Sequence, residues 1–210
     1  MKKKIAIIGS GIGGLTAANL FIKNSDFEII VYEKEEILSL DQGYGIQLAT
    51  NSISILNKIG LGNINNNDIF NPQKLNFYSN NNKICDLDLE IFNKDSVKYT
   101  TLQRSTLIEF LKDKLFTNNF RFGKEVRKVS KIKDKLLINF ADNTNDLVDF
   151  IIVSDGVFSN TKSIIENKTI KPRYNGSVTI RTVIKLSEEF NYDSKNISLI
   201  MFPNAHVVIY

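Results

Sequence analysis

The sequence has no tryptophan, one cysteine and one histidine among its 210 residues. One cysteine cannot form a disulfide within the chain and is typical of a reducing compartment. Because Cys85 alternates with Leu87 and Leu89, we expect it to be a small buried side chain of a strand. One histidine excludes a metal site built from several histidines, so we expect no metal. We interpret His206 as a strand residue, with a place facing a substrate pocket as the alternative.

Long apolar runs and clustered charge are also lacking. No stretch approaches the ~20 apolar residues that a membrane helix needs, so we expect no transmembrane segment. The 27 basic and 23 acidic residues leave a net charge of +4 and are interspersed, which excludes the basic stripe of a nucleic-acid binder. The apolar segment 5–8 runs directly into glycines without a signal-peptide cleavage site. The composition therefore predicts a cytoplasmic protein, and it leaves the oligomeric state open.

The first 32 residues have the pattern of a β-α-β unit. Residues 4–8 are an apolar run typical of a strand that is buried on both faces. Glycines follow, and apolar residues over 15–22 predict a helix, while residues 28–32 predict a second strand. This order predicts a parallel sheet.

A glycine-rich loop links the first strand to the helix, and its Gly9, Gly11 and Gly14 fit the pattern G-x-G-x-x-G. Gly9 permits the tight turn, Gly11 permits close approach of a pyrophosphate, and Gly14 permits close packing of helix and strand. The helix N-terminus offers free N–H groups to phosphates. Glu33 follows about 20 residues after the loop, where a carboxylate accepts hydrogen bonds from an adenosine ribose. The pattern predicts an adenine dinucleotide and leaves FAD and NAD open; a tight turn beside a solvated acid is the alternative.

The rest of the chain alternates short helices and strands. Thr106 and Glu109 have the spacing of a capping box, which predicts a helix start. Apolar spacing predicts helices over residues 51–59 and 107–115. Strands are expected over 75–79 and 84–89, joined as a hairpin by the turn at 80–82. Further strands are expected over 126–132, 136–140 and 147–153, from 178 onward, and over 207–210.

Three later segments resemble the single-component FAD-dependent aromatic hydroxylases, the family of salicylate, p-hydroxybenzoate and ubiquinone-pathway hydroxylases. Residues 43–48 (Gly-Tyr-Gly-Ile-Gln-Leu), with 51–62 after them, are similar to the family's G-x-G-I-x-L…N…L-x-x-L-G-L stretch. Residues 102–104 (Leu-Gln-Arg) resemble the start of its arginine-led helix. Residues 151–159 resemble its Asp-Gly motif at the end of a buried strand, with Ser159 available to cap the next helix.

The resemblance implies an α/β fold with two parts. Residues 1–72 and 95–170 would form a Rossmann-like FAD-binding domain with a parallel sheet and a β-meander. Residues 73–94 and 171–210 would form an incomplete mixed β-sheet of the substrate domain. Lys162 stands where the family usually has arginine, which loses the planar guanidinium fork. The residues that the resemblance places at FAD are Gly9, Gly11, Ile12, Gly13, Gly14, Glu33, Lys34, Arg104, Val126, Asp155 and Gly156.

The resemblance also implies an activity: hydroxylation of an aromatic or quinone-precursor substrate with NAD(P)H and O2, through a flavin hydroperoxide. The alternatives are a prenyl reductase, a halogenase, which the lack of tryptophan disfavours, and a non-catalytic nucleotide-binding fragment. The family's later Gly-Asp segment has no counterpart before Tyr210. We therefore expect the chain to be part of a longer enzyme and inactive alone. The sequence names no catalytic residue or substrate and does not separate NADH from NADPH.

Overall fold

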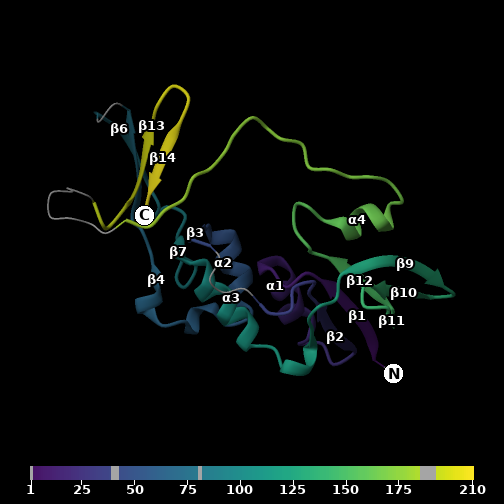
Figure 1. Ribbon diagram of the computed structural model, residues 1–210. Coiled ribbons are helices and arrows are strands. Elements are labelled where there is room, and N and C mark those ends of the chain that lie inside the picture. Colours follow the sequence, from purple (N-terminus) through teal and green to yellow (C-terminus); the bar gives the residue numbers. More distant parts are fainter. Residues whose placement is uncertain (1, 39–42, 80–81, 185–192) are drawn as a thin grey trace. The chain divides into compact units, whose positions relative to one another are not determined.

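The computed structural model describes residues 2–38, 43–79, 82–184 and 193–210 (Figure 1). The chain divides into two compact units, one formed by Met1–Asp41 and Leu107–Thr179 and the other by Gln42–Thr106 and Ile180–Tyr210. Each unit has its own sheets. Within the described residues, no helix is long and apolar enough to cross a membrane.

A four-stranded parallel sheet lies at the centre of the first unit, in the order β12-β1-β2-β8. Its strands are β1 (Lys3–Ile8), β2 (Phe27–Tyr32), β8 (Phe120–Arg121) and β12 (Phe150–Val153). The last four residues of β1 and of β2 are buried, as is typical of parallel strands that are covered on both faces. Helix α1 (Ile12–Phe21) connects β1 to β2 (Figure 1). The predicted β-α-β unit and parallel sheet are confirmed.

The predicted β-meander is also present in the first unit. It consists of β9 (Val126–Ile132), β10 (Lys135–Phe140) and β11 (Asn145–Val148), paired antiparallel in chain order. One buried cluster joins the meander to β1 and β2. Its members are Ala6, Ile8, Ile30, Tyr32, Val126, Ile138, Phe140 and Val148.

The predicted strand over residues 147–153 is wrong as a single element, because the chain changes sheets at Asp149. β11 pairs antiparallel with β10, whereas β12 pairs parallel with β1. The Asp149 N–H donates to the Lys4 carbonyl oxygen at 2.9 Å, and Asp149 Oδ2 accepts from the Lys4 N–H at 2.8 Å. These long-range bonds decide where the strand breaks, and the local apolar pattern does not contain them.

Polar contacts fasten the meander to the parallel sheet. Asp146 of β11 accepts from Lys4 Nζ at 2.6 and 2.7 Å and from the Tyr32 hydroxyl. Burial favours the neutral form of Asp146, but the hydrogen bonds from Lys4 and Tyr32 outweigh it and lower the pKa of this carboxyl. Burial, with the Asp146 contact, raises the pKa of Tyr32. Tyr32 also stacks on Phe140 with ring centroids 4.9 Å apart.

Three helical segments complete the first unit: the 3-10 turn Thr117–Asn119, α3 (Arg104–Asp113), in which the unit boundary falls, and α4 (Asn160–Ile165). The predicted cap of α4 is confirmed, since Ser159 Oγ accepts from the Lys162 N–H at 3.0 Å. The predicted capping box at Thr106 is wrong, because α3 already begins at Arg104. The helix follows directly on a strand, so tertiary pairing sets its start.

The second unit contains a three-stranded antiparallel sheet of β3 (Gly45–Leu48), β7 (Thr100–Gln103) and β4 (Ile69–Phe70), with β7 in the middle. Helix α2 (Thr50–Asn57) follows β3 and buries Ile53 and Leu56, as its apolar spacing predicts. Two 3-10 turns, Leu61–Asn63 and Asn66–Asp68, lead from α2 to β4.

A mixed sheet, also in the second unit, has the order β14-β13-β5-β6. The predicted hairpin is confirmed as β5 (Lys74–Ser79) paired antiparallel with β6 (Asn82–Asp88). The predicted terminal strand is β14 (His206–Ile209), and His206 lies in it. β13 (Ile197–Met201) was missed; it pairs parallel with β5 and antiparallel with β14.

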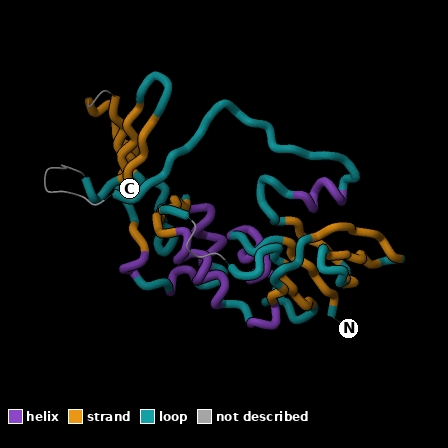
Figure 2. The backbone as a smooth tube through the Cα atoms, in the orientation of Figure 1, coloured by secondary structure: helices purple, strands orange, loops and turns teal. Residues whose placement is uncertain are grey.

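Two expectations fail in this region. Cys85 is exposed, because β6 is an outer strand of the sheet in the described part of the chain and is mostly open to solvent. The strand expected from Val178 is absent over residues 178–184, and its continuation lies outside the described residues. Val178 and Ile180 are 81% and 93% exposed, and Figure 2 draws the segment as loop. β-branched residues favour a strand, but only a paired neighbour makes one.

Candidate functional site

The carboxyl ends of β1, β12 and β2 meet at one edge of the parallel sheet. Ile8 is in register with Val153 on one side and with Tyr32 on the other. The loops that leave these ends are hydrogen-bonded together: the Gly9 N–H donates to the Tyr32 oxygen, and the Ser154 N–H donates to the Ile8 oxygen, both at 2.8 Å. This edge is where open α/β sheets bind ligands.

The glycines of the loop after β1 divide into two kinds. A Cβ on Gly9 (φ +100°) would lie 2.5 Å from the Ser154 carbonyl oxygen, and one on Gly14 would lie 2.0 Å from the Gly9 oxygen. These two glycines are required by packing. At Gly11 and Gly13, by contrast, no atom of the described chain lies within 4 Å of an added Cβ. The backbone there is open to an approaching ligand.

Helix α1 begins at this open backbone. Gly11 is its N-cap, and no side chain of the described residues caps the first turn. Unpartnered N–H groups and the positive end of the helix dipole together attract an anion. Ser154 Oγ bonds to the backbone at the start of the loop: it donates to the Ile8 oxygen at 2.9 Å and lies 3.3 Å from the Gly9 oxygen.

Glu33 follows β2 and is tied to the same loop. Its Oε2 accepts from the Ser10 N–H at 2.9 Å and from the Ser10 hydroxyl at 2.7 Å. Its Oε1 accepts from the Glu35 N–H at 3.1 Å. Burial would raise the pKa of Glu33, but the hydrogen bonds from Ser10 and from the backbone of Glu35 and Lys34 outweigh it and lower the pKa. Glu33 is therefore an ionised acceptor beside the loop.

Asp155 follows β12. Its Oδ2 accepts from the Thr161 N–H at 3.3 Å, whereas Oδ1 is buried without a hydrogen-bond partner among the described residues. A buried acceptor without a donor costs about 1–3 kcal/mol. The next residue, Gly156, has φ +89° and open space where a Cβ would be. Asp155 thus presents an acceptor that a ligand hydroxyl would satisfy.

Two other predicted residues lie close to this edge. The Lys34 side chain is exposed, and its Nζ lies 3.6 Å from Glu35 Oε1. Val126 is 4% exposed and belongs to the core, so its side chain is not presented to a ligand. The segment before it runs beside the end of β2, where the Lys124 N–H donates to the Glu33 oxygen at 2.8 Å.

Arg104 lies in the second unit, at the start of α3. Its N–H donates to the Tyr44 oxygen at 3.1 Å. Its aliphatic carbons cover Gly43 (φ +120°), where an added Cβ would lie 2.6 Å from Arg104 Cδ. Of the predicted residues, the structure therefore brings together Gly9 to Gly14, Glu33, Asp155 and Gly156, while Arg104 belongs to the other unit.

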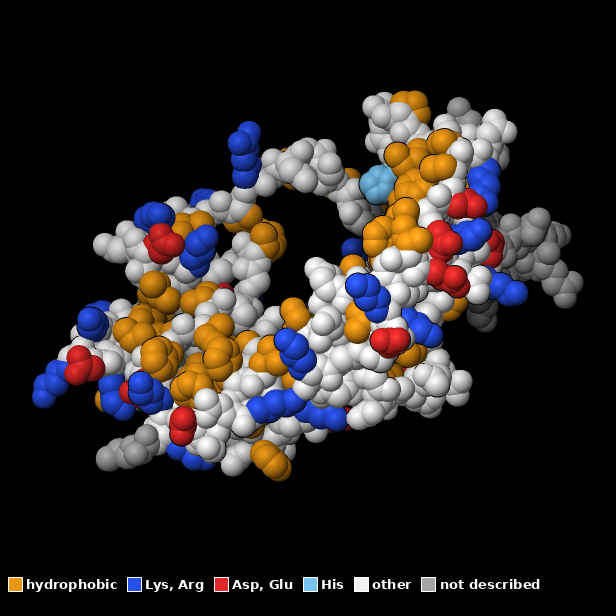
Figure 3. All heavy atoms as spheres, turned by 180° about the vertical axis from the view of Figure 1, so that it is seen from behind, with side chains coloured by type: hydrophobic (Ala, Val, Ile, Leu, Met, Phe, Trp, Pro, Cys, Tyr) orange, Lys and Arg blue, Asp and Glu red, His pale blue; other side chains and the backbone are white. Residues whose placement is uncertain are grey.

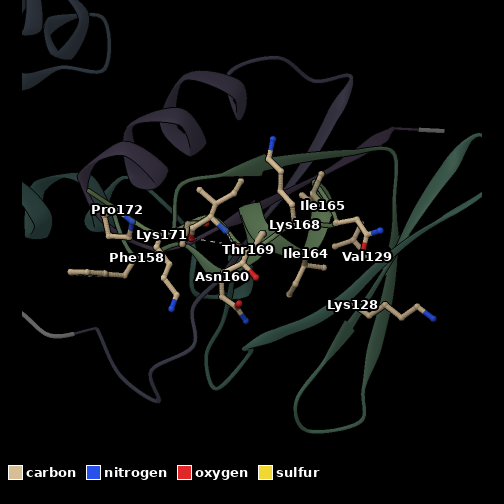
Figure 4. A pocket seen from close by; sticks show the side chains of 14 residues that line it. Lys128, Val129, Phe158, Asn160, Ile164, Ile165, Lys168, Thr169, Lys171 and Pro172 are labelled. Atoms are coloured by element: carbon tan, nitrogen blue, oxygen red, sulfur yellow. Dashed lines mark hydrogen bonds between the residues drawn. The ribbon is translucent and has the colours of Figure 1, made fainter. Parts of the chain in front are cut away.

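An open groove of about 1140 Å³ also lies in the first unit, between α4, β9 and the segment 167–172 (Figure 4). Ser163 ties the segment to α4, since its Oγ accepts from the Ile170 N–H at 3.0 Å. Lys128, Lys168 and Lys171 lie on the groove walls. None of the predicted cofactor residues lines the groove, so it is separate from the strand-end site.

Several known proteins are similar to the chain in sequence or in fold. A family described as an NAD(P)-binding Rossmann-like domain matches residues 7–42. The 6-hydroxynicotinate 3-monooxygenase of Pseudomonas fluorescens is 28% identical over 88% of the chain and 48% of its own length. The FAD-dependent urate hydroxylase of Klebsiella pneumoniae is 25% identical over 88% of the chain and 48% of its own length.

Among solved structures, Klebsiella pneumoniae HpxO complexed with FAD and uric acid matches 98% of the chain and 52% of its own length, with a TM-score of 0.82 and 19% identity. The chain has the fold of the FAD-dependent hydroxylases. The 2,6-dihydroxypyridine-3-hydroxylase of Arthrobacter nicotinovorans also matches, with a TM-score of 0.75 and 17% identity over 99% of the chain and 51% of its own. The expected resemblance and fold class are confirmed, and the chain spans about half the length of these relatives.

Sequence reasoning missed three polar residues of the strand-end site: Ser10, Ser154 and Thr161. Ser10 and Thr161 are 3% and 2% exposed, and all three hold the loops at the sheet edge through the bonds described above. Ser10 was within reach, since it is an x position inside the glycine pattern and a serine there is a donor next to the expected acid. Ser154 carried no comparable signal, because its partners, the Ile8 and Gly9 oxygens, lie far away in the sequence. Thr161 carried none because it bonds Asp155 through its backbone N–H, which every residue type except proline has.

Proposed function

We propose that this chain is the FAD-binding part of a flavin-dependent monooxygenase that uses NAD(P)H and O2 to hydroxylate a small aromatic or quinone-precursor substrate. The main support for this proposal is the edge of the parallel sheet. An uncapped helix N-terminus, the ionised Glu33 and the Asp155 oxygen without a partner in the described chain lie together there. These match the parts of an adenine dinucleotide with a sugar-alcohol chain: an anion, a ribose diol and further hydroxyls. The names of the relatives favour hydroxylation over prenyl reduction and halogenation.

Each residue has a proposed part in holding FAD. The N–H groups at the start of α1, from Ile12 to Gly14, would face the pyrophosphate beside Gly11. Glu33 would accept from the adenosine ribose, and Asp155 Oδ1 from a hydroxyl of the ribityl chain. Lys34, Gly156, Arg104 and the backbone of Val126 are proposed as further contacts. When bound, FAD supplies hydride acceptance from NAD(P)H and reaction with O2.

The division of labour within the chain is also a proposal. Residues 1–72 and 95–170 would bind FAD, and 73–94 and 171–210 would contribute to substrate binding. This division is by function. The boundaries of the compact units fall elsewhere, between residues 41 and 42, 106 and 107, and 179 and 180. In support, all four strands of the mixed sheet come from the two segments assigned to substrate. We further propose a cytoplasmic enzyme, in line with its single cysteine.

A flavin titration tests the proposal. The chain is mixed with FAD or FMN, and binding is followed by the change in flavin fluorescence. We expect FAD to bind more tightly than FMN, because Glu33 recognises the adenosine half that FMN lacks. Glu33→Ala is expected to weaken FAD binding by about 1–3 kcal/mol and to leave FMN binding unchanged. Equal affinity for FAD and FMN, or no affinity for FAD, would contradict the proposal.

A further inference from the structure

We propose that Ser10 is a positioning residue for the adenosine half of the dinucleotide, acting through Glu33. It holds the Glu33 carboxylate in the one orientation in which its other oxygen faces the ligand. The inference rests on the proposed function, since it concerns the same site. It adds a residue that is buried and whose hydroxyl donates to Glu33.

The contact between Ser10 and Glu33 is a two-point clamp. The Ser10 N–H and hydroxyl donate to the same carboxylate oxygen, Oε2, at 2.9 and 2.7 Å. The N–H is fixed by the glycine loop, because Gly9 before it is bonded to the Tyr32 oxygen. Two donors from one fixed residue define the direction as well as the position of the carboxylate. The clamp therefore couples the loop that faces the pyrophosphate to the acid that faces the ribose.

The second carboxylate oxygen of Glu33, Oε1, can accept a further hydrogen bond. Glu33 Oε1 accepts from the Glu35 N–H at 3.1 Å, the longest of the three contacts. A carboxylate offers about four acceptor positions in total. Oε2 is occupied by Ser10, so Oε1 is the atom that meets a ribose hydroxyl. Without the Ser10 hydroxyl, the carboxylate is held at Oε2 by the N–H alone and is free to turn.

Other roles for Ser10 fit the structure less well. Its side chain is 3% exposed, and its hydroxyl is already used as a donor to Glu33, so it is not presented to a phosphate. The nearby cations are engaged elsewhere: Lys34 Nζ lies 3.6 Å from Glu35, and Lys124 Nζ is bonded to Asp142. Hydrogen bonds, and Ser10 above all, thus hold Glu33 in place.

The test is a double-mutant cycle on the full chain with FAD and FMN as probes. Ser10→Ala removes the hydroxyl, and Ser10→Cys is the matched control that fills the same space but donates only weakly. We expect both variants to weaken FAD binding about tenfold, the size of a lost hydrogen bond to a charged group, and to change FMN binding less than about twofold. In a Glu33→Ala background, Ser10→Ala is expected to cost less than about twofold, because its partner is gone.

Each other outcome has a defined meaning. An unchanged FAD affinity in Ser10→Ala, or the same loss with and without Glu33, overturns the inference. A loss in Ser10→Ala but not in Ser10→Cys shows that Ser10 only fills space, which also overturns it. Should Ser10→Ala fail to fold, the Ser10→Cys arm of the cycle decides alone. A wild-type chain without affinity for FAD, or a Glu33→Ala variant with full affinity, overturns the proposed function itself.

Discussion

The parallel sheet of the first unit and the mixed sheet of the second unit differ most in burial. The last four residues of β1 are buried, whereas most residues of β6 and β14 are exposed. Apolar side chains such as Val207 and Phe202, both 46% exposed, reach the surface in the second unit. Figure 3 shows many apolar side chains at the surface on the face it draws. The buried ends of β1 and β2 carry the glycine loop and Glu33 of the candidate site, whereas β12, which leads to Asp155, is only partly buried.

The largest expected effect compares the two sheets directly. Ile7→Ala, at a side chain with 0% exposure, should lower the free energy of unfolding by about 4 kcal/mol, because it leaves a cavity in the core. Val207→Ala in β14 should cost less than about 0.5 kcal/mol. Urea unfolding followed by circular dichroism measures both. Similar losses at the two positions would show that the sheets do not differ in this way.

A glycine pair sharpens the comparison within the loop. Gly14→Ala should cost about 3 kcal/mol, since its Cβ would lie 2.0 Å from a backbone oxygen that can move only with β1. Gly11→Ala should cost less than about 1 kcal/mol, because the space beside it is open in the described chain. The same urea experiment reports both. A larger loss of stability in Gly11→Ala than in Gly14→Ala, in the absence of ligand, would show that Gly14 is not required by packing.

Substitution of Asp155 is expected to change FAD affinity much more than stability. Asp155→Ala removes a buried oxygen without a partner in the described chain, so stability should change by less than about 1 kcal/mol. FAD affinity should fall about tenfold, because the ligand hydroxyl loses its acceptor. Thermal unfolding and flavin titration of one preparation give both values. A large loss of stability with unchanged affinity would mark Asp155 as a purely structural residue.

The smallest expected effect is a dependence of stability on pH. The folded-state pKa of Glu33 is below its usual value of 4.5, so its ionised form contributes stability that is present above that value. This contribution is lost as the pH falls through the folded pKa. Glu33→Gln should therefore flatten the loss of stability below about pH 4.5, measured by urea unfolding between pH 3 and 7. If the free energy of unfolding fell equally in both proteins as the pH was lowered, Glu33 would not be held by these hydrogen bonds.

The sequence predicted the first unit better than the second, for physical reasons. β1, α1 and β2 follow one another, and their burial leaves a continuous apolar run, a glycine loop and a second run. β13 was missed although one of its partners, β14, follows it closely in the sequence. Its other partner, β5, lies far away, with Ile197 opposite Leu75, and this pairing places β13 inside the sheet. The exposure of Cys85 depends on the place of β6 at the outside of its sheet, which alternation along one strand does not encode.

The candidate site shows the same limit. Gly9, Gly14 and Glu33 were found because their spacing reflects one local unit. The clamp between Ser10 and Glu33 joins residues in adjacent loops, and the unpartnered oxygen of Asp155 exists only when β12 lies beside β1. The fold of the sheet edge determines which oxygen of a carboxylate has a hydrogen-bond partner. The sequence alone does not show it.

Hydrogen exchange of backbone amides, with and without FAD, tests most directly whether the cofactor binds at the strand ends of the first unit. Mass spectrometry of peptides from the full chain reports the change in each region. We predict that FAD slows exchange over residues 10–15, 33–35 and 155–158 and leaves residues 82–88 of β6 unchanged, because the open amides lie at the parallel sheet edge. Protection confined to the mixed sheet, or no protection over residues 10–15 at saturating FAD, would contradict the account.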